Sequence, residues 1–311
     1  MTDFASPRDL ARRTSAAVDA AVRAGRGLGL AVADAVVLHD VFSVVVHLAP
    51  APVVVRVPTV LPPTQDLAGL ARRQRAELAV TRWLDGRGVP VIPPSPLVPA
   101  EPVQRDGFSM TFWQFLEEDR SREPDYTARA EQVADLHAAL RGYPGPLSFL
   151  SSADPDFVEA SLDWLARHPG LLAPEALARA RREWAGLAPL LRSRAAFEAE
   201  FPGVDLQPVH GDSPPANIFS GVHGDRYADF ELVTFGPVEW DLAALGPERE
   251  AAYNRGARRA GLRELRPDVL AFVNAVGSLR VIASLALVPQ LPVLEQYLGP
   301  AIEGWLEGEE T

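Results

Sequence analysis

Three oxygen-bearing side chains stand in a fixed order within residues 209–243 and could together hold a magnesium ion and a phosphate chain. Asp212 and Asn217 are five residues apart, and Asp229 follows a second short apolar run. Mg²⁺ prefers oxygen ligands and keeps waters and phosphate oxygens in its coordination shell. A D-x-x-x-x-N spacing occurs in phosphoryl-transfer loops, where Asp contacts the acceptor hydroxyl and Asn binds the metal. The stretch therefore predicts phosphoryl transfer, with Asp212 as the catalytic residue and Asn217 and Asp229 as metal ligands.

The tripeptide His-Gly-Asp occurs twice, at 210–212 and at 223–225, and only the first copy has Asn at the required offset. The second copy lies between two short apolar runs, which is typical of a hairpin whose turn is formed by Gly224 and Asp225. We therefore expect Asp225 to be a solvated turn residue with no part in the chemistry.

The segment 209–243 resembles the core of the aminoglycoside phosphotransferase family, the antibiotic- and choline-kinase-like branch of the protein-kinase fold. That family reads roughly H-G-D-x-x-x-x-N, then I-D-F-E, then G-x-x-x-x-D-L-A. This chain has H-G-D-S-P-P-A-N, then A-D-F-E, then G-P-V-E-W-D-L-A. It departs at 213–216, where the family usually has Leu-His-Pro-Gly, and this difference affects the rigidity of the loop but not the ligand set.

The resemblance implies transfer of the γ-phosphoryl group of ATP (or GTP), with Mg²⁺, to a hydroxyl of a small molecule such as an aminoglycoside-like or other antibiotic. It also implies that His210 braces the catalytic loop and that Asp241 does the same from the following helix. Two alternatives stay open. One is a kinase of a metabolite such as an amino alcohol, sugar, nucleoside or secondary-metabolite intermediate. The other is a kinase-fold protein that binds a ligand without turnover, which the retained Asp212, Asn217 and Asp229 argue against.

The elements that must position these residues begin with three runs rich in valine, 35–38, 43–48 and 53–57, which predict antiparallel strands. Arg56 stands inside the third run, where a charge needs a partner. The chain has no lysine, so the lysine that contacts ATP phosphates in protein kinases must be replaced here. We interpret Arg56 as that phosphate ligand and Ser43 as a further phosphate donor. The alternatives are an edge-strand arginine that reaches solvent and a plain hairpin serine.

An apolar periodicity predicts a helix over about 65–85, and Glu77 lies at the edge of its inward stripe. This position suits an ion pair between Glu77 and Arg56, like the Lys–Glu pair of kinases. A rim glutamate in solvent is the alternative.

Residues 108–116 read as a strand, which the resemblance identifies with the hinge between two lobes. Backbone groups of Gln114, Phe115 and Leu116 would then bind adenine, and the surrounding apolar side chains would sandwich the base. An ordinary buried strand is the alternative.

The expected architecture is α+β: a bilobal protein-kinase-like fold with a small sheet-containing lobe, one key helix and a larger, mainly helical lobe. The N-terminal lobe would cover 1–113, the hinge 114–118 and the C-terminal lobe 119–311. Helices are predicted at 126–140, in two segments within 155–200, and after 243. Acidic residues within 154–159 are expected to edge the acceptor cleft.

Composition limits the other function classes. The 311 residues are 47% hydrophobic and contain no Cys, which excludes disulfides and thiol catalysis. A net charge of −11 disfavours non-specific nucleic-acid binding and would favour a cationic second substrate. The N-terminus lacks an apolar signal region, and the apolar stretch 271–288 carries Asn274 and Arg280, so no membrane span is expected. We expect a cytoplasmic protein that is a monomer or a homodimer.

Overall fold

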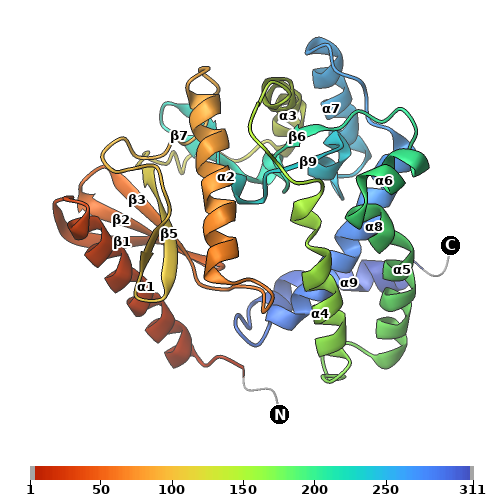
Figure 1. Ribbon diagram of the computed structural model, residues 1–311, viewed down its shortest axis with the longest axis horizontal. Helices are drawn as coiled ribbons and strands as arrows, with labels where there is room; N and C mark the ends of the chain where they lie inside the picture. Colours follow the sequence, from red (N-terminus) through yellow and green to blue (C-terminus); the bar gives the residue numbers. More distant parts are fainter. Residues whose placement is uncertain (1–3, 309–311) are drawn as a thin grey trace.

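A five-stranded antiparallel sheet forms one side of the molecule, and helices form most of the other side (Figure 1). The computed structural model describes residues 4–308. The strand order is β1-β2-β3-β5-β4. The strands are β1 (Val32–Asp40), β2 (Ser43–Pro50), β3 (Val53–Pro58), β4 (Val103–Arg105) and β5 (Phe108–Gln114). The predicted strands at 35–38, 43–48 and 53–57 are therefore confirmed.

The two faces of β2 serve different purposes because side chains alternate along a strand. Val44, Val46 and Leu48 are fully buried in a core that they share with the first helix. Val45 points to the opposite face, where it lines a pocket between the lobes. One strand thus holds the small lobe together and supplies a wall of the candidate site.

The first helix, α1 (Pro7–Gly27), packs against β1 and β2. Ser6 is its N-cap, and the Ser6 hydroxyl oxygen accepts a hydrogen bond from the Asp9 backbone N–H at 3.2 Å. Its buried side chains are small, and they allow the helix to approach the sheet closely: Ala17, Ala20, Ala21 and Ala24.

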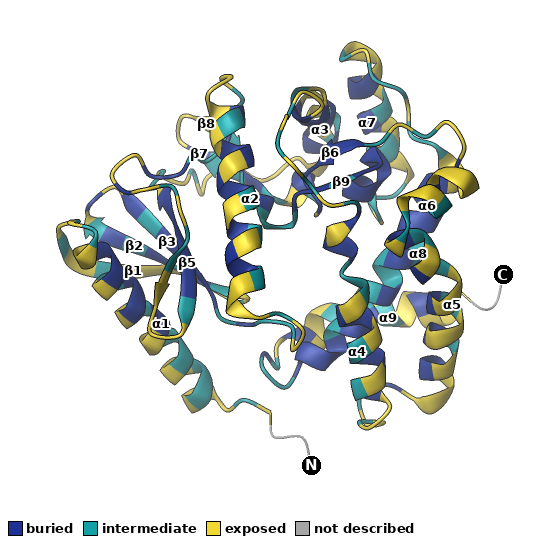
Figure 2. Ribbon diagram, in the orientation of Figure 1, coloured by how far each residue is buried: buried dark blue, intermediate teal, exposed yellow. Residues whose placement is uncertain are grey.

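The helix α2 (Leu67–Asp85) lies between the sheet and the rest of the molecule (Figure 2). Asp66 caps its start by accepting a hydrogen bond from the Gly69 N–H at 2.6 Å. The buried stripe of α2 includes Leu70, Leu78 and, among polar residues, Glu77. Because Glu77 is on the inward face, the helix can bring its carboxylate to the sheet.

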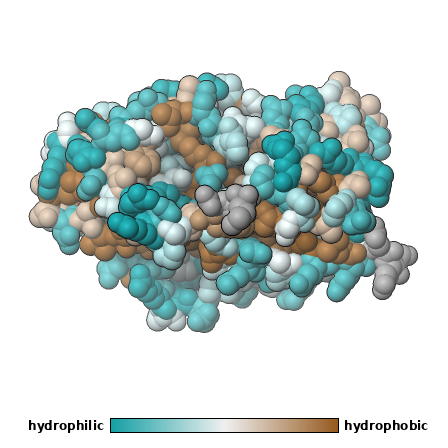
Figure 3. Space-filling view, turned by 90° about the horizontal axis from the view of Figure 1, so that it is seen from below, coloured by the Kyte–Doolittle hydropathy of each residue, from teal (hydrophilic) through white to brown (hydrophobic). Residues whose placement is uncertain are grey.

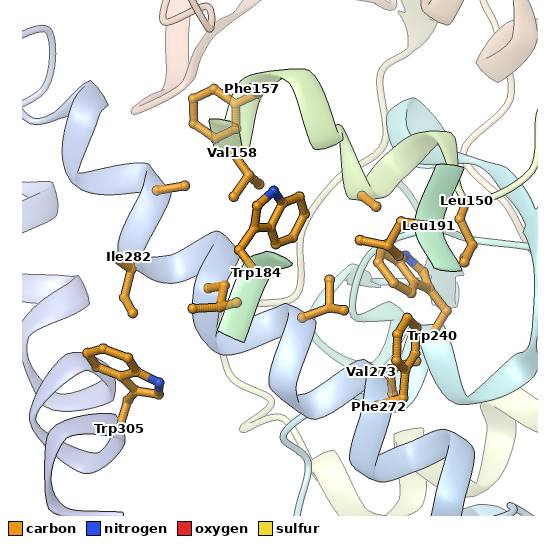
Figure 4. Packing of buried hydrophobic residues seen from close by; sticks show 14 of the residues in the cluster. Leu150, Phe157, Val158, Trp184, Leu191, Trp240, Phe272, Val273, Ile282 and Trp305 are labelled. Carbon is orange, nitrogen blue, oxygen red and sulfur yellow. The ribbon is translucent and has the colours of Figure 1, made fainter. Parts of the chain in front are cut away.

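The large lobe consists of helices around one core. They are α3 (Tyr126–Leu140), α4 (Pro155–Leu165), α5 (Pro174–Arg192), α6 (Arg194–Glu200), α7 (Pro247–Arg259), α8 (Pro267–Ala283) and α9 (Leu294–Glu307). Figure 4 shows Trp184 of α5, Trp240, and Phe272 and Ile282 of α8 within this core. The range 155–200 contains three helices rather than the two predicted, since Ser193 caps a separate α6.

Two further sheets have two strands each. One pairs β6 (Gln207–Val209) with β9 (Thr234–Gly236), and the other pairs β7 (Ile218–Gly221) with β8 (Gly224–Tyr227). All motif residues of 210–229 lie between or beside these four strands. The predicted bilobal α+β architecture is confirmed. The proposed boundaries at 113 and 118 stay a prediction.

Within residues 4–308, one helical stretch, Pro267–Leu287, is long and apolar enough to cross a membrane. Its 18-residue window has a mean hydropathy of 1.8, but 56% of that window is buried inside the protein. Burial of this kind is what a core helix has, so the stretch is weak evidence for a membrane span. On the face seen in Figure 3, apolar residues lie among hydrophilic ones.

Candidate active site

The first His-Gly-Asp copy forms a tight loop directly after β6. Gly211 has φ +91°, and a Cβ atom on it would lie 1.7 Å from the backbone oxygen of Leu232. Only glycine fits such a position. The next residue, Asp212, is exposed, and its Oδ2 atom accepts a hydrogen bond from Asn217 Nδ2 at 3.1 Å. The five-residue spacing thus brings these two side chains together, as predicted.

The side chain of Asp241 supports this loop. Its carboxylate is buried and accepts hydrogen bonds from the backbone N–H of His210 at 2.8 Å and of Gly211 at 2.7 Å. The Nε2 atom of His137 also lies 2.9 Å from the carboxylate. Several donors on one buried carboxylate hold it in one position. The support expected of Asp241 is present, but the residue lies in a short 3₁₀ turn, Val238–Leu242, and not in a following α-helix.

His210 contributes to the same support. Its Nε2 atom lies 2.9 Å from the backbone oxygen of Ala228 and must be the donor, since a carbonyl oxygen only accepts. This bond ties the catalytic loop to the residue before Asp229. The indole Nε1–H of Trp240 donates to the Gly211 oxygen at 3.2 Å. Asp212 therefore follows two residues whose backbones are fixed from several sides.

The β7–β8 register determines where Asn217 and Asp229 lie relative to each other. Ile218 pairs with Tyr227, and the Ala228 N–H donates to the Asn217 oxygen at 2.9 Å, so the hairpin continues by one more pair. Asn217 and Asp229 consequently lie at the same end of the hairpin. Asp229 adopts a left-handed conformation with φ +60°, a strained geometry that occurs often at functional sites.

The hairpin predicted around the second His-Gly-Asp copy is present, but its details differ from the prediction. The turn is formed by Val222 and His223, and Asp225 lies inside β8. The Asp225 carboxylate pairs with Arg122 at 3.0 Å rather than being free in solvent. Within residues 4–308 the Asp225 carboxylate has no bond to the loop of Asp212, and its expected lack of a chemical role stays a prediction.

Arg56 occupies the centre of a cluster of three carboxylates. Its guanidinium forms ion pairs with Glu77 and Asp229, and with Glu231 at 2.8 Å. Burial alone would lower the pKa of Arg56, but the charges of Glu77, Asp229 and Glu231 outweigh it and raise this pKa. The predicted Arg56–Glu77 ion pair is therefore confirmed, and the two alternatives in which these residues face solvent are excluded.

Burial shifts the pKa of two carboxyl groups in this cluster. Burial raises the pKa of Glu77, although the charge of Arg56 acts in the opposite direction. Burial likewise raises the pKa of Glu231. Glu231 was not among the site residues predicted from the sequence. Its position two residues after Asp229 could have indicated that it belongs to the same cluster, because Phe230 between them is buried and turns both acids to one side.

A pocket of about 200 Å³ lies beside Arg56, between the sheet and the β7–β8 hairpin. Arg56, Glu77 and Asp229 line one part of it. The other walls are mostly apolar: Val45, Val54, Ile92, Trp113, Leu116 and Phe219. A flat apolar slot next to a cation and a carboxylate matches the shape and charge of a nucleotide.

The three residues expected to bind adenine differ in their backbone contacts, and their assignment stays a prediction; Gln114 and Leu116 line the pocket. The Gln114 N–H donates to the Pro93 oxygen at 3.0 Å and the Phe115 N–H to the Pro52 oxygen at 2.9 Å, so both donors are occupied. The Phe115 ring stacks on His47, with 3.9 Å between centroids, and is not part of the pocket wall. Among the described residues, no partner for the Leu116 N–H is present, and its side chain lines the pocket.

Ser43 begins β2, where it pairs across the sheet with Pro58. The wall of the pocket includes Val45, two residues further along, and Ser43 itself lies outside it. Its assignment as a phosphate donor gains no support from this position and stays a prediction.

The residues present fit a magnesium ion, although they do not form a protein-only site. In residues 4–308, no three His, Cys, Asp or Glu side chains are grouped as metal ligands. Asp229 and Asn217 offer one carboxylate and one amide oxygen, and the Asp229 side chain is 48% exposed beside Arg56. Mg²⁺ usually takes one or two protein ligands and completes its shell with waters and phosphate oxygens. This donor set is therefore adequate only together with a bound phosphate chain.

Comparison with known proteins agrees with this geometry. The chain matches the model of a phosphotransferase enzyme family (APH) over residues 43–272. No curated protein matches it. Similar solved structures include APH(2")-IIia in complex with GDP and kanamycin, with a TM-score of 0.58, 14% identity, and coverage of 90% of this chain and 94% of that one.

A second is the aminoglycoside phosphotransferase APH(3'')-Id from Streptomyces rimosus with ADP and streptomycin: TM-score 0.55, 20% identity, and coverage of 84% and 98%. A third is the choline kinase LicA from Streptococcus pneumoniae: TM-score 0.55, 14% identity, and coverage of 93% and 99%. At these identities the likeness is one of fold. Because the family model covers well over half of the chain, the chain belongs to the phosphotransferase enzyme family, whose members are kinases that phosphorylate hydroxyl groups of small molecules.

Proposed function

We propose that this protein transfers the γ-phosphoryl group of ATP or GTP, with Mg²⁺, to a hydroxyl group of a small molecule. The observation that carries the proposal is the convergence of Asp212, Asn217 and Asp229 at one end of the β7–β8 hairpin, beside Arg56 and the apolar pocket. The nucleotide complexes among the similar structures also support the use of a nucleotide.

Each residue has one role in this proposal. Asp212 orients the acceptor hydroxyl and takes its proton as the oxygen bonds to the γ-phosphorus and the bond to the leaving nucleoside diphosphate breaks. Asn217 and Asp229 would hold Mg²⁺, which neutralises charge on the phosphate oxygens. Arg56, kept in place by Glu77, would release Asp229 to the metal and contact the phosphate chain. Phosphoryl transfer depends mainly on positioning and charge neutralisation, so these groups suffice.

Two classes of acceptor fit this chemistry. The kanamycin and streptomycin complexes among the similar structures favour an antibiotic and a role in resistance, but identities of 20% or less carry no substrate from one chain to another. A metabolite acceptor that carries a negative group is favoured by one observation: Arg280, which has no ion pair within residues 4–308, lies beside the catalytic loop. We propose the metabolite class as the stronger candidate for the acceptor.

The test is a comparison of Asp212→Asn with Asp225→Asn, which makes the same substitution in the second His-Gly-Asp copy. Nucleotide binding with Mg²⁺ is measured by calorimetry, and transfer or nucleotide hydrolysis by release of the nucleoside diphosphate. We expect Asp212→Asn to bind nucleotide within about threefold of the wild type and to lose at least 100-fold in turnover, while Asp225→Asn retains turnover. Equal turnover in the wild type and Asp212→Asn would reject the proposed role.

A further inference from the structure

One arginine beside the catalytic loop is not used by the proposed mechanism. Arg280 lies near the C-terminal end of α8, and its guanidinium carbon is 5.8 Å from the centre of the Trp240 ring. The same indole donates a hydrogen bond to the oxygen of Gly211, the residue before Asp212. Arg280 therefore lies on the large-lobe side of the loop, whereas Arg56 and the apolar pocket lie toward the sheet.

Arg280 is a half-buried arginine beside the catalytic loop that lacks an acidic partner among the described residues. Across residues 4–308, its guanidinium forms no ion pair and no hydrogen bond to the protein. By contrast, Arg263 forms two bonds to Glu239 at 2.6 and 2.8 Å, and Arg56 has three carboxylates. A half-buried guanidinium has lost part of its hydration without gaining an anionic partner, so a ligand that supplies a negative charge would be stabilised there.

The nearest acidic groups do not fill that place. Asp154 at the start of α4 is bound by Arg73 of α2 at 2.7 Å, so its charge is already neutralised. Burial lowers the pKa of Arg280, while the charges of Asp212 and Asp154 act in the opposite direction and Arg73 adds to the lowering. Asp212 thus acts on Arg280 through its charge, and within residues 4–308 the two side chains share no hydrogen bond or ion pair, so the guanidinium is available to a ligand beside the catalytic loop.

We propose that Arg280 binds an oxyanion group, a carboxylate or a phosphate, on the same small molecule whose hydroxyl faces Asp212. This inference rests on the proposed function and narrows its acceptor to hydroxylated molecules with a negative group. The planar guanidinium can give two parallel hydrogen bonds to such a group. Anchoring one end of the acceptor would hold its hydroxyl in line with the phosphate chain.

The inference reverses the expectation drawn from the net charge of −11, which favoured a cationic substrate. The net charge acts on diffusional approach and is screened within about 10 Å in physiological salt. At contact distance, the nearest charge without a partner determines which ligand binds, and here that charge is the guanidinium of Arg280. The other acids expected to edge the cleft, Asp156 and Glu159, both pair with Arg192 of α5.

The experiment measures binding of matched probe pairs to the full chain with Mg²⁺ and a non-hydrolysable ATP analogue, by saturation-transfer NMR. The pairs are glycerate with glycerol, homoserine with 3-amino-1-propanol, and glucose 6-phosphate with glucose. The proteins are the wild type, Arg280→Gln and Arg167→Gln, whose arginine is exposed at the end of α4 with no bond from its side chain to residues 4–308.

We expect at least tenfold tighter binding of one or more anionic probes over their partners in the wild type and in Arg167→Gln, and loss of that preference in Arg280→Gln. The inference is overturned if no anionic probe binds, if the neutral or cationic partners bind as well, or if Arg280→Gln keeps the preference. A tenfold rise in the nucleotide KM of Arg280→Gln with unchanged probe preference would reassign Arg280 to the nucleotide and also overturn it.

Acceptor-independent nucleotide hydrolysis separates this inference from the proposed function. Hydrolysis that depends on Asp212, together with no preference for anionic probes, would leave the proposed function standing and remove the inference alone. A folded wild-type protein that neither binds nor hydrolyses nucleotide would instead reject the proposed function, whatever the probes do.

Discussion

Replacing Asp241 by Asn removes the charge that holds the catalytic loop while leaving every proposed substrate contact in place. The two carboxylate oxygens are used differently: Oδ1 accepts from the Gly211 N–H, and Oδ2 accepts from the His210 N–H and faces His137 Nε2. An amide of the same shape has one acceptor oxygen. In either orientation, at least one buried donor of the loop or of His137 loses its partner and faces an NH₂ group.

The expected magnitude follows from these bonds. A hydrogen bond to a charged group contributes about 1.5–3 kcal/mol, and an unsatisfied buried donor costs about 1–3 kcal/mol. Because the two effects overlap, we expect the free energy of unfolding of Asp241→Asn to fall by about 2–4 kcal/mol. Asp212 follows Gly211 directly, and a displacement of roughly 1 Å at a reacting group costs about 100-fold in rate. We therefore expect kcat to fall roughly 10- to 100-fold.

Urea denaturation measures the free energy of unfolding, and steady-state release of nucleoside diphosphate measures kcat and the nucleotide KM. The nucleotide KM of Asp241→Asn should stay within about threefold of the wild type, because the pocket lies on the other side of the loop. Asp225→Asn is the control, since its exposed ion pair with Arg122 contributes at most about 1 kcal/mol. A variant that loses stability but keeps the wild-type kcat would refute the positioning role of Asp241.

Three further outcomes are expected. Arg56→Met removes the charge that opposes the raised pKa of Glu77, so this carboxyl should bind its proton still more tightly in the folded state. Stability then falls as the pH rises from about 4.3, the unfolded value, through the folded pKa, and urea titrations at pH 5 and pH 8 should differ more in the variant than in the wild type. Gly211→Ala would put a Cβ atom 1.7 Å from the Leu232 oxygen, and we expect at least a tenfold loss of kcat; normal turnover in this variant would contradict the loop geometry. Gly256→Ala, whose Cβ atom would lie 2.1 Å from a backbone oxygen of α3, should lower stability by about 2 kcal/mol or more on thermal unfolding while the nucleotide affinity of the folded protein is kept.

Much of the site could be predicted because its residues are close together in the sequence. The spacing between Asp212 and Asn217 is short enough for one tight loop to bring them into contact. The three valine-rich runs and the position of Arg56 inside the third likewise predicted antiparallel strands with one charge that needs a partner. Local patterns of this kind survive folding, because neighbours along the chain cannot move far apart.

The predictions that needed correction depended on contacts between distant segments. Distant segments also determine which backbone groups of the expected hinge stay free, since the N–H groups of Gln114 and Phe115 donate to the oxygens of Pro93 and Pro52. Asp225 lies in a strand because the β7–β8 register puts the turn two residues earlier than the Gly-Asp pair suggested.

The amino-acid sequence by itself determined the chemical class, phosphoryl transfer, since an ordered set of oxygen ligands and a basic residue inside an apolar strand can be recognised without coordinates. Only the tertiary structure decided which charges are neutralised. In the sequence, Arg280 served only as an argument against a membrane span. In the folded protein it lies beside the catalytic loop, and Arg73 forms the ion pair with the nearby Asp154. Pairing between charges is a property of distances across the fold, and no spacing along a chain encodes it directly.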